Sequence, residues 1–284
     1  MLRNFVIGIR TVLMKNVRSI ERKVIFDERY RLYVYQFLVF RSWFSAGGCD
    51  SVIKIENVSV NNWESAIRGM RNPLNSWDKS DSYFCAGWYD EECSKNCVYN
   101  HVCDEVTKRF VVGESDLTLM KQLVKAGTDH RKFMRFITVT CDITAPLYWW
   151  KEYSTYKVGT VANSCSTMHT LPKKEFTLDD FSHEHLHSFC CCGQYEFDAM
   201  DWLYGTICNL NLLRDCYLQT KDKKYWWQMI QLLPSSYNQR RTVLLNYEVL
   251  MNMYHARKNH KLDEWRDFCG WVESLPYMGV FLNA

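Results

Sequence analysis

Apolar and polar residues alternate along several short stretches of the chain, and this two-residue period is typical of strands. The stretch "VIKIENVSV" (residues 52–60) alternates in this way and is rich in β-branched residues. The stretch "RFITVTCDITAP" (residues 135–146) has strong β-propensity and stops at Pro146. We therefore expect a strand at each of these two places.

A period of three to four residues replaces the alternation elsewhere and predicts helices. In residues 113–127, Ser115 is a candidate N-cap and Gly127 ends the pattern. The apolar stripe of this helix consists of Leu117, Met120, Leu123 and Val124. Further helices are predicted for residues 61–71, for 197–234 with a turn near 220–224, and for 246–274 with a break near 257–265.

The remaining stretches connect these elements. Thr177 is a candidate helix cap with acidic residues in the first turn after it, and residues 235–245 are predicted to form a short strand or a turn. The Cys-rich segment 83–104 is predicted to be a loop or insertion. This order indicates a mixed α/β fold (α+β mixed) with a helix-rich C-terminal half, which we expect to form one domain over residues 49–284.

Composition supports a folded domain. The chain has 284 residues, of which 47% are hydrophobic and only 5 are Pro, which is typical of a compact globular protein. No apolar run reaches the roughly 18 residues needed to cross a bilayer, so no membrane association is expected. The 11 Trp and 17 Tyr suggest planar binding surfaces, although large aromatic residues more commonly belong to a core.

The positive charge is concentrated in residues 1–48, which carry nine Lys and Arg but only three acidic residues. Their net charge is +6, which leaves −3 for the rest of the chain and gives no reason to expect nucleic-acid binding by the main body. A basic leader can bind nucleic acid or act as a targeting peptide. The alternative is that the natural domain begins near residue 51, and that residues 1–48 are a basic N-terminal extension or follow a start codon placed too far upstream.

Thirteen Cys without a secretory signal indicate free thiols in a reducing cytoplasm. Two Cys and His clusters occur, at residues 85–103 and 183–192, and each has enough ligands for zinc. Neither contains the CxxC pair typical of structural zinc sites, so we expect no metal. A zinc-supported interaction protein remains an alternative hypothesis.

Common catalytic motifs are missing from the sequence, including GxGxxG, GxxxxGKS/T, GxSxG and HExxH. The last third contains a set of polar residues on "NYEVLMNMYHAR", namely Asn246, Asn252 and Arg257. The spacing places Asn246 and Arg257 near one side of a helix, with Asn252 about 120° away. A solvated helix face explains this pattern as well as a site does, but Arg257 is suited to hold an anionic planar ligand.

Three passages together resemble the flavin-dependent thymidylate synthase family, over roughly residues 53–278. They are "KAG…HRKF…ITVTCDITAPLYWWKEY", then "LLPSSYNQRRTVLLN", and finally "NYEVLMNMYHARKNHKLDEWRDF". Their order and spacing agree with the family. The resemblance implies a central sheet flanked by helices, a homotetramer with sites shared between subunits, and transfer of a one-carbon unit from methylenetetrahydrofolate to C5 of dUMP, with FAD reduced by NADPH.

The resemblance also implies roles for individual residues. Arg257 falls on the arginine that holds the uracil ring and stabilises charge on it, and Asn246 and Asn252 fall on asparagines that contact the flavin. The remaining cofactor-binding positions implied are His130, Tyr156, Lys157 and Asn163. The remaining substrate-binding positions are Ser166, Thr155 and Gln231.

The family's Arg-His-Arg signature is replaced here by Thr155, Tyr156 and Lys157, so most charges of that binding loop are exchanged. Other departures are Ser164, Met168, Thr128 and Ile230, at positions where the family has charged residues or a histidine. These changes remove several contacts to anions but affect the flavin positions less. A catalytically degenerate relative that binds a nucleotide or flavin without turnover is therefore a second hypothesis.

Overall fold

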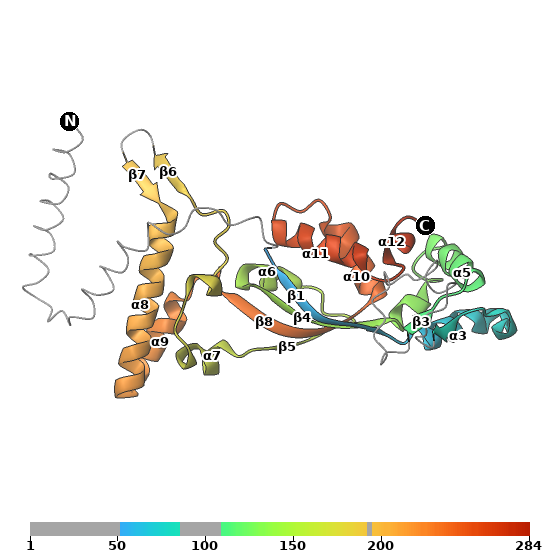
Figure 1. Cartoon of the computed structure of the whole chain (residues 1–284), viewed down its shortest axis with the longest axis horizontal. Helices are drawn as coiled ribbons and strands as arrows, with labels where there is room; N and C mark the ends of the chain where they lie inside the picture. Colours follow the sequence, from blue (N-terminus) through green and yellow to red (C-terminus); the bar gives the residue numbers. More distant parts are fainter. Residues whose placement is uncertain (1–51, 86–108, 192–194) are drawn as a thin grey trace, which may run out of the picture.

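Four antiparallel strands form the central sheet in the order β1–β4–β8–β5 (Figure 1). Their bounds are Lys54–Asn61 for β1, Thr138–Pro146 for β4, Val161–Ser164 for β5 and Asn238–Asn246 for β8. The coordinates are those of a computed structural model, which describes residues 52–85, 109–191 and 195–284. In the central pair, Thr138 lies opposite Asn246 and Pro146 lies opposite Asn238.

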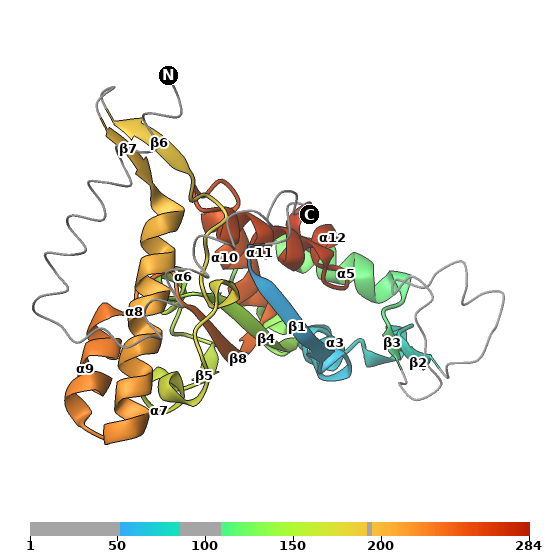
Figure 2. The same ribbon diagram turned by 60° about the vertical axis from the view of Figure 1, so that its left-hand side comes forward.

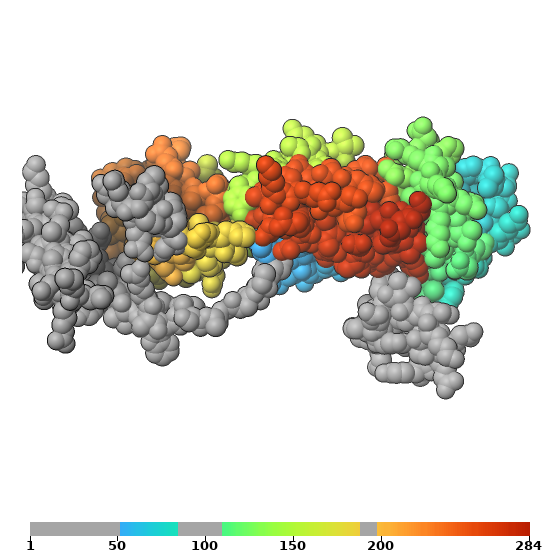
Figure 3. All heavy atoms as spheres, turned by 90° about the horizontal axis from the view of Figure 1, so that it is seen from above, coloured from blue at the N-terminus to red at the C-terminus, as the bar shows by residue number. Residues whose placement is uncertain are grey.

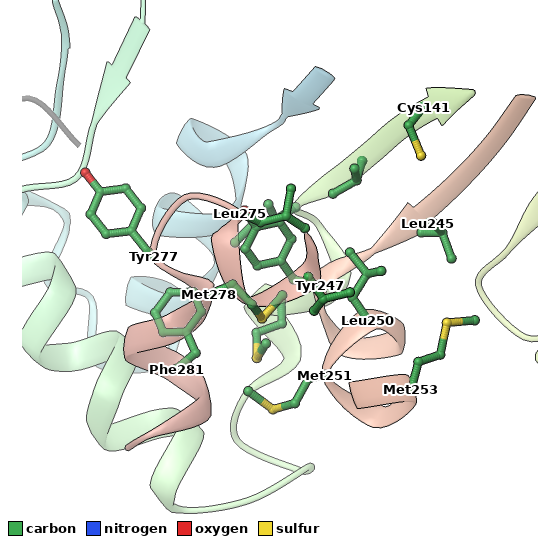
Figure 4. Packing of buried hydrophobic residues seen from close by; sticks show 14 of the residues in the cluster. Cys141, Leu245, Tyr247, Leu250, Met251, Met253, Leu275, Tyr277, Met278 and Phe281 are labelled. Atoms are coloured by element: carbon green, nitrogen blue, oxygen red, sulfur yellow. The ribbon is translucent and has the colours of Figure 1, made fainter. Parts of the chain in front are cut away.

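Helices cover one face of this sheet (Figure 1). Along β4 every second side chain is buried, including Val139, Cys141 and Ile143, because successive residues of a strand point to opposite faces. The covering elements include α6 (Leu147–Tyr153), α10 (Tyr247–Arg257), α11 (Asp263–Ser274) and α12 (Met278–Leu282). Figure 4 shows apolar side chains of α10, of α12 and of the residues just before α12, which belong to the same main core as Cys141 of β4 and Leu245 of β8.

The opposite face of the sheet is open in the described part of the chain. Thr242 and Leu244 on β8 are exposed, and so is every residue of the edge strand β5. Asp142 accepts hydrogen bonds from Thr242, Arg240 and Asn57 at 2.5–2.7 Å, which joins β1, β4 and β8 across this face. These bonds hold the pKa of Asp142 well below its usual range.

A second hydrophobic cluster lies at one end of the molecule (Figure 2). There α8 (Ala199–Thr220) packs beside α9 (Lys223–Leu232), below the hairpin of β6 (Ser188–Cys191) and β7 (Tyr195–Asp198). Leu203, Ile207 and Leu210 of α8 meet Leu171 and Phe181 of the segment between α7 (Thr167–Thr170) and β6.

Two further helices and a short hairpin complete the other end of the molecule. These are α3 (Trp63–Arg71), α5 (Glu114–Lys125) and the pair of β2 (Tyr83–Cys85) with β3 (Arg109–Val111). Figure 3 shows α10–α12 between this end and the α8–α9 end. Five 3-10 turns, Asn72–Leu74, Trp77–Lys79, Lys132–Arg135, Leu171–Lys173 and Leu178–Asp180, occur among the described connections.

The mixed α/β fold class is confirmed, whereas some local expectations are wrong. Gly113 and not Ser115 precedes α5, and the Ser115 hydroxyl instead accepts from Arg71 Nη2 and donates to the Lys79 carbonyl oxygen, both at 3.0 Å. Thr177 caps a single 3-10 turn rather than a helix. Residues 1–51 and 86–108, which include the basic extension and most of the Cys-rich segment, lie outside the described residues.

Candidate functional site

The segment between α6 and β5 runs along α10 and contacts both of its ends. The Tyr156 hydroxyl accepts a hydrogen bond from Arg257 Nε at 2.8 Å, at the C-terminal end of the helix. At the N-terminal end, a Cβ atom on Gly159 would lie 2.8 Å from Asn246 Nδ2. Gly159 has a φ of +77°, which lets the backbone approach α10 this closely. The fold therefore brings Tyr156, Asn246 and Arg257 to one side of α10.

Arg257 lies at the centre of a polar cluster. Its Nη1 atom donates to Glu152 Oε2 at 2.5 Å, and its guanidinium lies over the ring of Trp265, 4.7 Å from the ring centroid. Trp265 Nε1 donates to the same Glu152 oxygen at 3.1 Å, and His260 Nε2 lies 3.4 Å from it. We call Glu152, Tyr156, Arg257, His260 and Trp265 the Arg257 cluster.

The positions of these residues follow from ordinary helix chemistry. Arg257 is in the last turn of α10, where a cation interacts favourably with the helix dipole. Asn246 is the N-cap of the same helix, and its Oδ1 accepts from Val249 N at 3.0 Å, so part of its hydrogen-bonding capacity serves the helix itself. The Arg257 side chain is 19% exposed, which leaves it accessible to a ligand.

A second polar group lies on another side of α10. Arg131 makes a two-bonded ion pair with Glu248, with N–O distances of 2.9 and 3.1 Å, and its Nη2 donates to Asn252 Oδ1 at 3.3 Å. His130 is exposed and next to Arg131 in the chain. Asn252 therefore faces Arg131 and not the segment at residues 154–160, and sequence reasoning missed both Arg131 and Glu248.

A pocket of about 380 Å³ lies beside the predicted binding loop. Ser166 precedes α7, and its neighbours Cys165 and Thr167 line the pocket together with Tyr237, just before β8, and Asn238, the first residue of β8. The pocket also carries the cations Lys173, Lys174 and Arg240 and the acids Asp179 and Asp180.

Two groups of this pocket have unusual surroundings. Burial, together with the nearby Asp180 carboxylate, raises the pKa of Tyr237 to about 12, so its hydroxyl stays neutral and can donate. Asn238 Oδ1 is buried and has no hydrogen-bond partner within residues 52–85, 109–191 and 195–284. A ligand with a donor group would satisfy this oxygen.

The other predicted residues are dispersed. Thr155 uses its hydroxyl to donate to the Glu152 carbonyl oxygen at 2.8 Å, and Lys157 is exposed one residue after Tyr156. Asn163 is exposed on β5 opposite Thr242, and Gln231 is exposed on α9, beside the second hydrophobic cluster. No described hydrogen bond joins Asn163 or Gln231 to the Arg257 cluster.

Two negative findings apply to the residues that the structure describes. They contain no group of three or more His, Cys, Asp or Glu side chains arranged to hold a metal ion. They also contain no helix that is both long enough and apolar enough to span a membrane.

Comparison with solved structures identifies the fold. No protein-family model and no curated protein sequence matches this chain. A structure of the flavin-dependent thymidylate synthase ThyX from Helicobacter pylori with FAD and dUMP aligns with a TM-score of 0.54 and 15% identity, covering 81% of this chain and 98% of that chain. A second structure of that enzyme with FAD and dUMP aligns with a TM-score of 0.52 and 14% identity, covering 81% and 96%. The chain therefore has the fold of the flavin-dependent thymidylate synthases, which the sequence resemblance predicted.

Proposed function

We propose that the chain is a flavin-dependent methyltransferase of the thymidylate synthase type. It would transfer a one-carbon unit from methylenetetrahydrofolate to C5 of dUMP or a related uracil nucleotide, with FAD that NADPH has reduced. The fold likeness to enzymes solved with FAD and dUMP supports this proposal. The observation that carries it for this chain is the contact between Tyr156 of the binding loop and Arg257, which are 101 residues apart in sequence.

The residues present fit planar and anionic ligands. Arg257 combines a guanidinium with the rings of Trp265 and Tyr156, with centroids 4.7 and 5.6 Å away, a combination that suits a heterocyclic ring. Lys173 borders the pocket beside Ser166 and would offer positive charge to a phosphate, whereas Lys174 is already paired with Asp180 at 2.5 Å. When bound, the flavin would supply the hydride.

The roles of the protein's own residues are binding and electrostatic stabilisation. Arg257 would orient the uracil ring and stabilise negative charge that develops on it. Lys157, Thr155 and Ser166 would hold the substrate and the loop. Asn246, Asn252, His130, Tyr156 and Asn163 would contact the flavin. Gln231 lies on α9, away from the Arg257 cluster, so it would contact the substrate only in a site that is formed with a second copy of the chain.

We also propose that the protein assembles as a homotetramer in the cytoplasm. The open face of the sheet and the exposed edge strand β5, where Val161 is 64% exposed, support assembly with other copies. Five cysteines of the described residues are free thiols, which a reducing compartment preserves: Cys141, Cys165, Cys208, Cys216 and Cys269.

The first test is the visible absorption spectrum of the purified protein, followed by FAD titration and an assay with dUMP. Bound flavin and turnover are expected, and Arg257→Ala should reduce turnover by about 10²–10³-fold because a transition-state donor is lost. Arg68→Ala, on the exposed side of α3, is the matched control and should leave turnover unchanged. Turnover within a few-fold of wild type in Arg257→Ala would contradict the proposed role of Arg257.

A second candidate function is binding of a nucleotide or flavin without turnover. The Glu152 carboxylate that already contacts Arg257, together with the missing Arg-His-Arg signature, favours it. Bound FAD with no product from any uracil nucleotide would support this second function over the first.

A further inference from the structure

The Glu152 carboxylate is an unusual neighbour for an arginine that is expected to hold an anionic ligand. One oxygen, Oε2, accepts from Arg257 Nη1 at 2.5 Å and from Trp265 Nε1 at 3.1 Å, with His260 Nε2 at 3.4 Å. Glu152 is 34% exposed, so the carboxylate faces both Arg257 and solvent. The Arg257 cluster therefore already contains an anion supplied by the chain itself.

This arrangement changes what the cluster can bind. An arginine alone attracts anions, whereas an arginine paired with a carboxylate presents almost no net charge to a ligand. Arg257 Nη2 and Glu152 Oε1 make no hydrogen bond to any described residue, so a donor and an acceptor remain available. A ring with a carbonyl oxygen next to an N–H group, a lactam, offers the complementary acceptor and donor.

We propose that Glu152 is a specificity-determining residue that makes the Arg257 cluster select neutral lactam rings and reject rings that carry a negative charge. Selection arises because the carboxylate repels a second anion placed next to Arg257. Arg257 keeps its own positive charge within the pair, so it can still stabilise charge that develops on a ring during a reaction. The inference rests on the proposed function only in taking a pyrimidine ring as the ligand.

Two small rings of nearly the same shape test the proposal. Uracil is neutral at neutral pH, whereas barbiturate, the same ring with a third carbonyl group, is an anion. Their dissociation constants are measured by ligand-observed NMR titration of the full chain, for wild type, Glu152→Gln and Glu273→Gln. Glu152→Gln removes the charge and keeps the length and an accepting oxygen. Glu273→Gln makes the same change in net charge at an exposed position of α11, outside the cluster.

Wild type should bind uracil about tenfold or more tighter than barbiturate. Glu152→Gln should lower this ratio by about tenfold, mainly by binding barbiturate more tightly, and Glu273→Gln should keep the wild-type ratio. An unchanged ratio in Glu152→Gln would overturn the proposal. Equal affinities in wild type, or no binding of either ring by wild type, would overturn it as well, and these two outcomes do not depend on how the variant folds.

The ring-preference measurement separates this proposal from the proposed function. If wild type binds FAD and turns over dUMP, but Glu152→Gln has the same uracil-to-barbiturate affinity ratio as wild type, only the proposed role of Glu152 is refuted. A ratio change in a protein without flavin or turnover refutes the enzymatic proposal and leaves the role of Glu152 intact.

Discussion

Gly159 provides a sharp test of the contact between the binding loop and α10. Its φ of +77° lies in the left-handed region, which costs a residue with a side chain roughly 1–2 kcal/mol. In Gly159→Ala the new methyl group would also lie 2.8 Å from Asn246 Nδ2 and 3.0 Å from Val249 Cγ2, and crowding of this kind costs about 1–3 kcal/mol. We therefore expect Gly159→Ala to lower the free energy of unfolding by about 2–5 kcal/mol.

Equilibrium urea unfolding measures this change, and Gly270→Ala is the matched control. Gly270 is exposed on α11, and a Cβ atom there would have no neighbour within 4 Å among the residues that the structure describes. Because alanine favours helix more than glycine does, Gly270→Ala should raise the free energy of unfolding by about 0.5–1 kcal/mol. The same substitution thus has opposite expected signs at the two positions. A Gly159→Ala variant as stable as wild type would refute the proposed packing of the loop on α10.

Two further predictions concern buried groups. Burial raises the pKa of Asp116, but hydrogen bonds from Ser82, Ser80 and Arg71 lower it more, so its pKa is below the ordinary value. The ionised carboxylate therefore stabilises the fold above about pH 4, and this stabilisation is lost as the pH falls further. Asp116→Asn breaks a buried ion pair with Arg71, so it should lower the free energy of unfolding in urea by about 3–5 kcal/mol at neutral pH. The free energy of unfolding of this variant should also fall less than that of wild type as the pH is lowered below about 4. The same fall in both proteins would contradict the role of Asp116. Burial raises the pKa of the Cys141 thiol to about 12 and that of the Cys269 thiol to about 11. Brief alkylation near pH 8, followed by peptide mass spectrometry, should therefore find the exposed Cys165 labelled well before either buried thiol. Equal labelling of all three thiols would show that solvent reaches the core.

Local sequence signals predicted the longer helices, α3, α5 and α8 to α11, and the strands β1 and β4, but not the short elements α6, α7, α12 and β5. The alternation in residues 52–60 corresponds to β1, Pro234 follows α9 closely, and Gly127 follows α5 with a φ of +98°. The stretch 238–246 was harder, because "NQRRTVLLN" has two adjacent arginines and two adjacent leucines and so lacks a clean alternation. It becomes a full strand because β4 and β5 satisfy its backbone hydrogen bonds on both sides.

The candidate site was predicted in part. Arg257 and Tyr156 were expected to be site residues, yet nothing in the sequence paired them or indicated Glu152 as the partner of Arg257. Arg131 and Glu248, which are 117 residues apart in sequence, form an ion pair that local periodicity cannot reveal. Asn246 can be identified from the sequence as a helix N-cap, because asparagine is common at that position. This capping role explains the residue as well as a contact to a ligand does.

By itself, the sequence determined the longer helices, the strands β1 and β4, and the fold family that the chain resembles, because these signals depend mainly on residues within a few positions of one another. Only the tertiary structure decided which charged side chains lie next to one another in the candidate site. Glu152 and Arg257 are 105 residues apart, and their contact depends on how α6 and α10 pack on the same face of the sheet. Coulomb attraction depends on distance in space and not on separation along the chain, so a carboxylate that looks unremarkable in sequence becomes the counter-ion of the proposed ligand site.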